Sequence, residues 1–119
     1  MDKFIFEKLE VYQKTLDFIG KTIDIVSKLP PEIRYSLGEH LIKTAISIAN
    51  NIAEGCGRKG KGEKRQFYHI SQGSSFECVP MITVLIKKNL VTQAEFEDLY
   101  NRCYSISQML SKLILSVGI

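Results

Sequence analysis

The part of the sequence most able to do chemistry is a glycine-rich, basic stretch near its middle, Gly55–Arg65. Its glycines match the pattern G-x-G-x-x-G, and Gly55-x4-Gly60-Lys61 matches most of a P-loop. Both motifs bind phosphate only after a strand, where the turn aims backbone amides and a helix N-terminus at the ligand. Here an apolar helical pattern precedes the glycines, and Gly62 stands where a P-loop carries its magnesium-binding Ser or Thr. We therefore do not expect a nucleotide site.

The same stretch concentrates the positive charge of the chain. The formal net charge of the whole protein is +3, whereas segment Gly57–Arg65 alone carries +4 and the remainder sums to −1. A local basic cluster of this kind can bind the phosphates of a nucleic acid, or it can simply be a solvated turn. The candidate nucleic-acid-binding residues are Arg58, Lys59, Lys61, Lys64 and Arg65.

Other reactive residue types do not form a recognisable site. A carboxylate-bound di-metal centre in a helical bundle needs Glu-x-x-His pairs, and the sequence contains none. The three cysteines are widely spaced without a Cys-x-x-Cys pair, which argues against a zinc site or a disulfide framework. His69, Ser74 and Glu77 resemble a triad by type, but their spacing along one helix does not bring the side chains together. We expect no catalytic residue, no metal, no cofactor and no enzymatic activity.

Four helical segments must position these residues. The spacing of apolar residues predicts helices over about 5–28, 32–55, 61–88 and 93–117. Two prolines at positions 30 and 31 separate the first pair, glycines end the second helix, and Thr92 with Glu95 forms a capping box for the fourth. No segment alternates as a strand would. With 119 residues, we expect a single domain, 1–119, that folds as an all-α, antiparallel up-down four-helix bundle with short loops.

Apolar rows predict which faces of the helices are buried. The first and third helices each show one row, and the second shows two adjacent rows. So wide a face means either that the second helix is central in the bundle or that another copy of the chain covers part of it. The predicted rows are Ile5, Leu9, Tyr12, Leu16, Ile19, Ile23 and Val26 in the first helix, Leu37, Leu41, Ala45, Ile48 and Ile52 with Ile42, Ile46, Ala49 and Ala53 in the second, and Phe67, Ile70, Ser74, Cys78, Met81 and Leu85 in the third.

Polar residues interrupt these predicted core faces. Asn51 and Glu54 lie beside the apolar row of the second helix, and Ser74 and Glu77 lie along that of the third. Buried carboxylates need partners, and the nearest candidates are Arg58 or Arg65. The hypothesis is a structural polar network that fixes the register of the two helices.

These residues also carry a family resemblance. The run Asn51-Ile-Ala-Glu-Gly55, followed by Gly57-Arg58, Glu63, Phe67, Ile70, Gly73-Ser74 and Glu77, resembles the "four helix bundle protein" family, whose members include proteins encoded in intervening sequences of bacterial 23S ribosomal RNA genes. The opening Phe6-x-x-Leu9-x-Val11-Tyr12-Gln13 is also similar, with Tyr12 where Trp is more usual. The chain departs from the family pattern at Asn50, where Ser is common, and at Val79-Pro80-Met81, where polar residues are usual.

The resemblance implies a cytoplasmic bundle that assembles into a ring, a homopentamer. It also implies a relation to the accessory proteins of diversity-generating retroelements, which engage nucleic acid and a reverse transcriptase. The sequence agrees in containing no apolar run of membrane-spanning length and no signal-peptide pattern at its start.

Two hypotheses about function follow. The first is a non-enzymatic, self-assembling module whose basic turns, repeated around a ring, bind RNA or DNA. The alternative is a protein-interaction scaffold in which the basic turn is only solvated.

Overall fold

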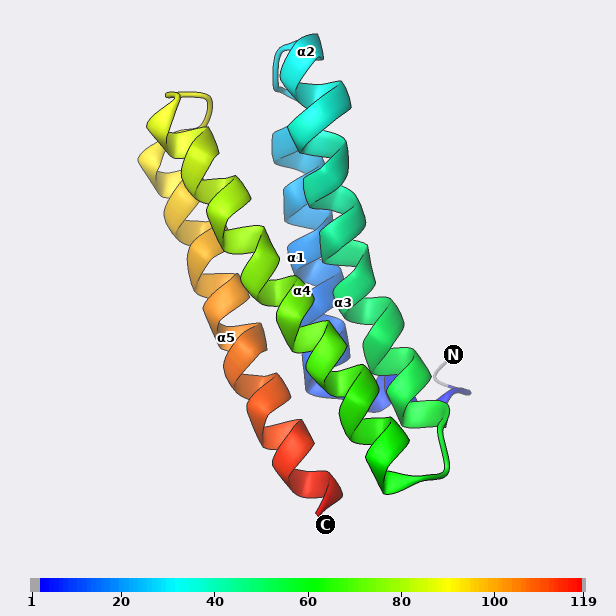
Figure 1. Cartoon of the computed structure of the whole chain (residues 1–119). Helices are drawn as coiled ribbons and strands as arrows, with labels where there is room; N and C mark the ends of the chain where they lie inside the picture. Colours follow the sequence, from blue (N-terminus) through cyan, green and yellow to red (C-terminus); the bar gives the residue numbers. More distant parts are fainter. Residues whose placement is uncertain (1–2, 119) are drawn as a thin grey trace.

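The computed structural model describes residues 3–118, which form a bundle of four long helices. These are α1 (Glu10–Val26), α3 (Glu39–Gly57), α4 (Lys61–Lys87) and α5 (Gln93–Val117), and no strand occurs within the described range. Successive helices run up and down (Figure 1), and α5 packs back against α1, which closes the bundle. The predicted all-α four-helix bundle is confirmed.

The ends of the helices follow the predicted signals closely. Thr92 and Glu95 form the capping box of α5: the Glu95 amide donates to Thr92 Oγ1 at 3.1 Å, and the Thr92 amide donates to Glu95 Oε1 at 2.8 Å. After α4, Asn89 adopts a left-handed conformation with φ 57°. The amide of Leu90 then donates to the carbonyl of Leu85 at 2.9 Å, which ends the helix.

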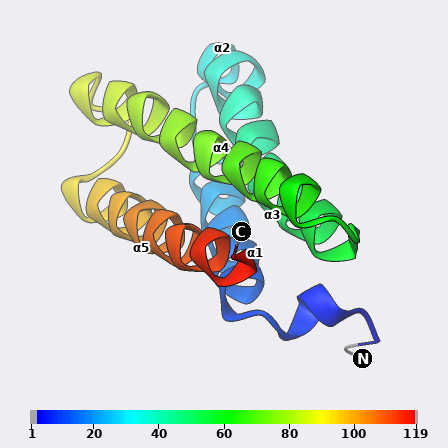
Figure 2. The same cartoon turned by 60° about the horizontal axis from the view of Figure 1, so that its bottom comes forward.

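The first helix begins later than predicted. Residues Ile5–Lys8 form a short 3-10 helix, η1, and Leu9 is extended, with φ −74° and ψ 129°. Helix α1 starts only at Glu10. The side chain of Ile5 is 74% exposed, so it does not contribute to the packed row that its spacing suggested. Figure 2 shows η1 at one end of the bundle, where it contacts α1 and α3.

The buried face of α1 also differs from the predicted row. Leu16 and Ile23 are 40% and 45% exposed, whereas Thr15 and Thr22 are fully buried with Phe18 between them. Each threonine hydroxyl donates to the carbonyl four residues earlier, at 2.7 Å and 2.8 Å. Threonine can face the core here because its hydroxyl is satisfied within its own helix.

The second predicted helix is one continuous helical stretch of three parts: α2 (Pro31–Ile33), a π-helical turn η2 (Arg34–Gly38), and α3. Gly38 in the π turn lies against α1, since an added Cβ would sit 2.7 Å from Val26 Cγ1. Helix α3 packs against both α1 and α4. Its wide apolar face is thus largely covered within one chain, and only Ile46 of the two predicted rows is exposed, at 38%.

Helices α3 and α4 approach closely because small residues line their contact. The buried face of α4 includes three serines, Ser71, Ser74 and Ser75, while the predicted Ile70 is 45% exposed. The predicted row of α4 was therefore wrong at Ile70.

Within residues 3–118, no helix combines the length and apolarity that a membrane span needs.

Candidate nucleic-acid interface

The predicted basic turn is a tight connection between α3 and α4, at the same end of the bundle as both chain termini (Figure 1). Arg58 and Gly60 have extended backbones, with φ/ψ of −78°/150° and −77°/136°, and α4 begins at Lys61. The side chains of Lys59 and Lys61 are exposed. A helix precedes the glycines, which confirms that the turn lacks the strand of a phosphate-binding loop.

Arg58 is held on the surface by two neighbours. Its Nη2 donates to Glu54 Oε2 at 3.0 Å, and its guanidinium carbon lies 4.8 Å from the centre of the Phe67 ring. The two charged side chains remain about half exposed, at 43% and 56%. Arg58 therefore presents a flat, oriented cation to solvent.

Lys64 and Arg65 both donate to backbone carbonyls of the protein itself. Lys64 Nζ donates to the carbonyls of Gly55 and Cys56, at 3.3 Å and 2.9 Å, and so caps the C-terminus of α3. Arg65 Nη1 donates to the carbonyl of Gly118, which ties the C-terminal end of the chain to α4. Arg58, Lys59 and Lys61 are thus the candidates that lie at the exposed surface of the turn.

Of the predicted polar network, the structure joins Asn51 and Ser74 and leaves Glu54 and Glu77 on the surface. Asn51 Nδ2 donates to the carbonyl and the hydroxyl of Ser47, at 2.8 Å and 3.1 Å, and Ser47 Oγ lies 3.0 Å from Ser74 Oγ. Asn51 and Ser74 are thereby linked between α3 and α4 through Ser47, which the sequence analysis did not single out. Glu54 and Glu77 are exposed, so their assignment to the core was wrong.

Ser71 adds a second polar link that the sequence analysis missed. Its buried hydroxyl donates to the carbonyl of Ile48 at 2.8 Å. The signal that could have revealed both links is the cluster of serines on the α4 row. Buried polar contacts of this kind position two helices against each other as long as every group is paired.

An open cleft of about 590 Å³ lies between η1 and the C-terminal part of α3, beside the basic turn. Its lining combines one aromatic ring, one amide, two charged groups and two small residues: Phe6, Asn50, Ala53, Glu54, Gly57 and Arg58. The Phe6 ring stacks on Phe4 at 5.6 Å and meets Tyr12 edge-on at 5.0 Å. Sequence reasoning missed this cleft because its two walls are more than 40 residues apart in the chain.

Side chains that commonly bind metals do not cluster in the described part of the chain. No group of three or more His, Cys, Asp or Glu side chains between residues 3 and 118 could hold a metal ion. His40 and His69 are both exposed. The most perturbed oxygen acid is the buried Tyr68, whose pKa is raised to about 12 by burial and by the neighbouring Cys56. A phenol that stays protonated at neutral pH is a structural group in this setting.

Comparisons with known proteins agree with the fold. A crystal structure of a protein of unknown function from the S23 ribosomal protein family of Bacteroides thetaiotaomicron matches with a TM-score of 0.81. The match covers 87% of this chain and 97% of that chain at 20% sequence identity, so it shows a shared fold. The search of curated proteins finds no match. The family model described as 23S rRNA-intervening sequence protein matches residues 7–112, nearly the whole chain. This chain belongs to the 23S rRNA-intervening sequence protein family.

Proposed function

We propose that the protein is a non-enzymatic, self-assembling helical module that binds RNA or DNA through its basic turn. The observation that carries this proposal is the concentration of positive charge between α3 and α4, where Arg58, Lys59 and Lys61 are all exposed. Phosphate contacts of this kind supply the part of nucleic-acid affinity that does not depend on base sequence.

Self-assembly is supported by apolar side chains that one chain leaves exposed. Leu16 and Ile23 on α1 are 40% and 45% exposed, and Phe76 on α4 and Tyr104 on α5 are 57% and 59% exposed. Exposed apolar patches mark interaction sites, and head-to-tail contacts between two different patches form a ring where the rotation between copies closes. The family resemblance suggests five copies. A ring would repeat the basic turn and raise the affinity for a long polyanion above that of one turn.

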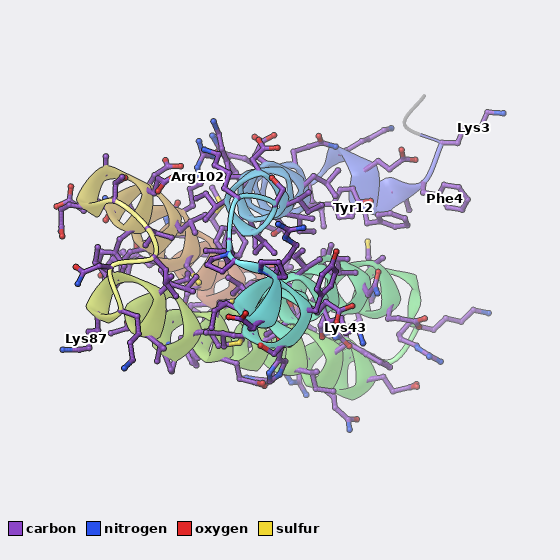
Figure 3. The ribbon with its side chains drawn as sticks, turned by 90° about the horizontal axis from the view of Figure 1, so that it is seen from above. Lys3, Phe4, Tyr12, Lys43, Lys87 and Arg102 are labelled. Carbon is purple, nitrogen blue, oxygen red and sulfur yellow. The ribbon has the colours of Figure 1, made fainter. Side chains whose placement is uncertain are left out.

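An electrophoretic shift assay at low and at physiological salt tests the binding. We expect a shift at low salt that weakens as salt rises. The variant Lys59→Gln/Lys61→Gln should weaken binding by about tenfold or more, because it removes two cations that can contact phosphates. It should also make the affinity less dependent on salt. The matched control is Lys43→Gln/Lys87→Gln, which removes the same charge from exposed positions outside the turn (Figure 3). Absence of a shift at low salt, or equal losses in both variants, would refute the proposal.

Assembly is tested separately by light scattering at micromolar concentration. We expect a homo-oligomer, and a stable monomer would contradict the ring. Binding of a protein partner, such as the reverse transcriptase that the resemblance suggests, is tested by co-purification after nuclease treatment.

The second candidate function is a protein-interaction scaffold. It is favoured by a small surface hollow of about 70 Å³ between α4 and α5, lined by Phe76, Val79, Tyr100 and Tyr104 among others. Aromatic rings around a hollow are typical anchor sites in protein interfaces. Recovery of a protein partner that Tyr104→Ala abolishes, together with unchanged behaviour of the lysine variants, would favour the scaffold.

A further inference from the structure

We infer that the cleft between η1 and α3 binds an unpaired base of a single-stranded nucleic acid, whose phosphates lie on the basic turn. This inference depends on the proposed function and adds the class of ligand: a single strand rather than a duplex. The base site uses Phe6, Asn50 and Arg58 in the cleft and Phe4 beside it. Of these four residues, only Arg58 is needed to bind the phosphates of a duplex.

The groups that line the cleft suit the two faces and the edge of a base. The Phe6 ring and the Arg58 guanidinium both line the cleft and are planar groups on which a base can stack. Phe4 covers one face of Phe6 and Phe67 covers one face of Arg58, so a base would use the opposite face of each. Asn50 carries both a donor and an acceptor, and the Glu54 carboxylate accepts, so both kinds of base-edge group have a partner. A cleft for a phosphate alone would not need an aromatic wall.

The size and openness of the cleft fit an unpaired nucleotide. About 590 Å³ lies within the range of roughly 300–1,000 Å³ that is usual for small-molecule sites. A base in a duplex is stacked on both faces and paired along its edge, so it cannot enter without being flipped out. A base in a single strand is already available at little cost.

Both walls of the cleft are held in place before any ligand arrives. On the η1 side, the Phe4 amide donates to Glu7 Oε1 at 3.0 Å, and Gln13 Nε2 donates to the Glu7 carbonyl at 2.9 Å. The Phe6 ring also rests edge-on against Tyr12. On the α3 side, Glu54 and Phe67 orient Arg58, as described above. Binding to a preformed cleft avoids much of the entropy cost of ordering loops.

Phe4 offers a second stacking surface outside the cleft. Its ring is 65% exposed and stacks on Phe6, with 5.6 Å between the ring centres and 29° between the planes. Figure 3 shows Phe4 projecting from the side of the molecule, with Lys3 beyond it. A base next to the one in the cleft can therefore stack on Phe4. Stacking on an aromatic side chain is worth about five- to 150-fold in affinity for each base.

Fluorescence anisotropy with a labelled oligonucleotide of about 12 nucleotides tests the inference. The probes are single-stranded RNA, single-stranded DNA and the DNA duplex of the same sequence. For Phe4→Ala we expect at least fivefold weaker binding of single strands and no change for the duplex. The matched control is Ile5→Ala, which removes a neighbouring apolar side chain that is 74% exposed but has no ring. Lys59→Gln/Lys61→Gln should weaken all three probes.

A direct readout comes from Phe4→Trp. The protein contains no tryptophan, so this variant carries a single tryptophan at the proposed stacking position. We expect Phe4→Trp to bind single strands with the affinity of the unchanged protein. Its tryptophan fluorescence should be quenched by single strands but not by the duplex. The RNA and DNA probes decide which single strand is preferred.

The outcomes separate this inference from the proposed function. If single strands and duplex bind equally, or if Phe4→Ala matches Ile5→Ala, the base site is wrong while the basic turn still binds nucleic acid. If Phe4→Ala instead lowers the oligomeric state seen by light scattering, Phe4 is a contact between copies and the base site is also wrong. If no probe binds at low salt, the proposed function itself fails.

Discussion

The tight fit of Gly55 on α3 against Tyr68 on α4 predicts that Gly55 cannot be replaced even by alanine without a loss of stability. A Cβ at this position would lie 2.6 Å and 2.8 Å from Cε1 and Cδ1 of Tyr68, and 3.1 Å from Cβ of Phe67. The Tyr68 ring is only 4% exposed, so it cannot swing into solvent. Gly55→Ala must therefore push the two helices apart or strain the ring.

The expected magnitude combines two opposing effects. Alanine is favoured over glycine inside a helix by about 1 kcal/mol. Overpacking a tight contact costs about 1–3 kcal/mol or more, and separations below 3 Å to a buried ring place this site at the upper end. We expect a net loss of about 1–2 kcal/mol in the free energy of unfolding. For a chain of this length, that is a fall of about 4–8 °C in Tm.

Urea unfolding followed by circular dichroism at 222 nm measures this loss. The control is Gly73→Ala, in the middle of α4, where an added Cβ meets nothing within 4 Å and should stabilise the helix by up to about 1 kcal/mol. In a Tyr68→Leu background, Gly55→Ala should cost less, because the ring it meets has been removed. The reasoning is refuted if Gly55→Ala proves as stable as Gly73→Ala.

Three further predictions concern single groups. Lys64→Met should lose about 1 kcal/mol in urea unfolding because it uncaps α3, whereas Lys59→Met should be neutral; equal effects would contradict the capping role. Thr92→Ala should lose about 1 kcal/mol by the same measurement, and no loss would mean that the capping box with Glu95 is dispensable. The step in absorbance at 295 nm that Tyr68→Phe removes should have its midpoint near pH 12, because burial raises the pKa of Tyr68 to about 12. Since the pKa of Tyr68 in the unfolded chain is about 10, its contribution to stability is full below pH 10 and is lost as pH rises through 12; a midpoint near pH 10 for the step that Tyr68→Phe removes would contradict this.

The architecture was predictable because the helix-ending signals are local. The prolines after Leu29, the glycines after Glu54 and the capping box at Thr92 act within one or two turns of the backbone, so the sequence shows them directly. The 3-10 segment at Ile5–Lys8 was not predictable in the same way. The four-residue spacing of Ile5 and Leu9 fits a helix as well as the observed turn.

The buried faces were less predictable than the helices because burial was inferred from apolar residues. In α1 the core row contains Thr15 and Thr22, and in α4 it contains Ser71, Ser74 and Ser75. These side chains satisfy their hydroxyls locally or across the helix pair, so they can be buried in the core although they are polar.

The candidate site was predictable only in part. Charge clustering located the turn correctly, but it could not show that Lys64 caps α3 or that Arg65 meets the C-terminal end of the chain, since both contacts depend on the tertiary fold. The cleft with Phe6 likewise exists only because η1 is brought beside α3.

The close fit at Gly55 shows what the run from Asn51 to Gly55 does in this chain. The run satisfies a spacing requirement: Asn51 links to α4 through Ser47, and Gly55 leaves room for Tyr68. These residues fix how two helices fit together, not what the surface binds. The ligand of this chain must therefore be sought in its turn and its cleft.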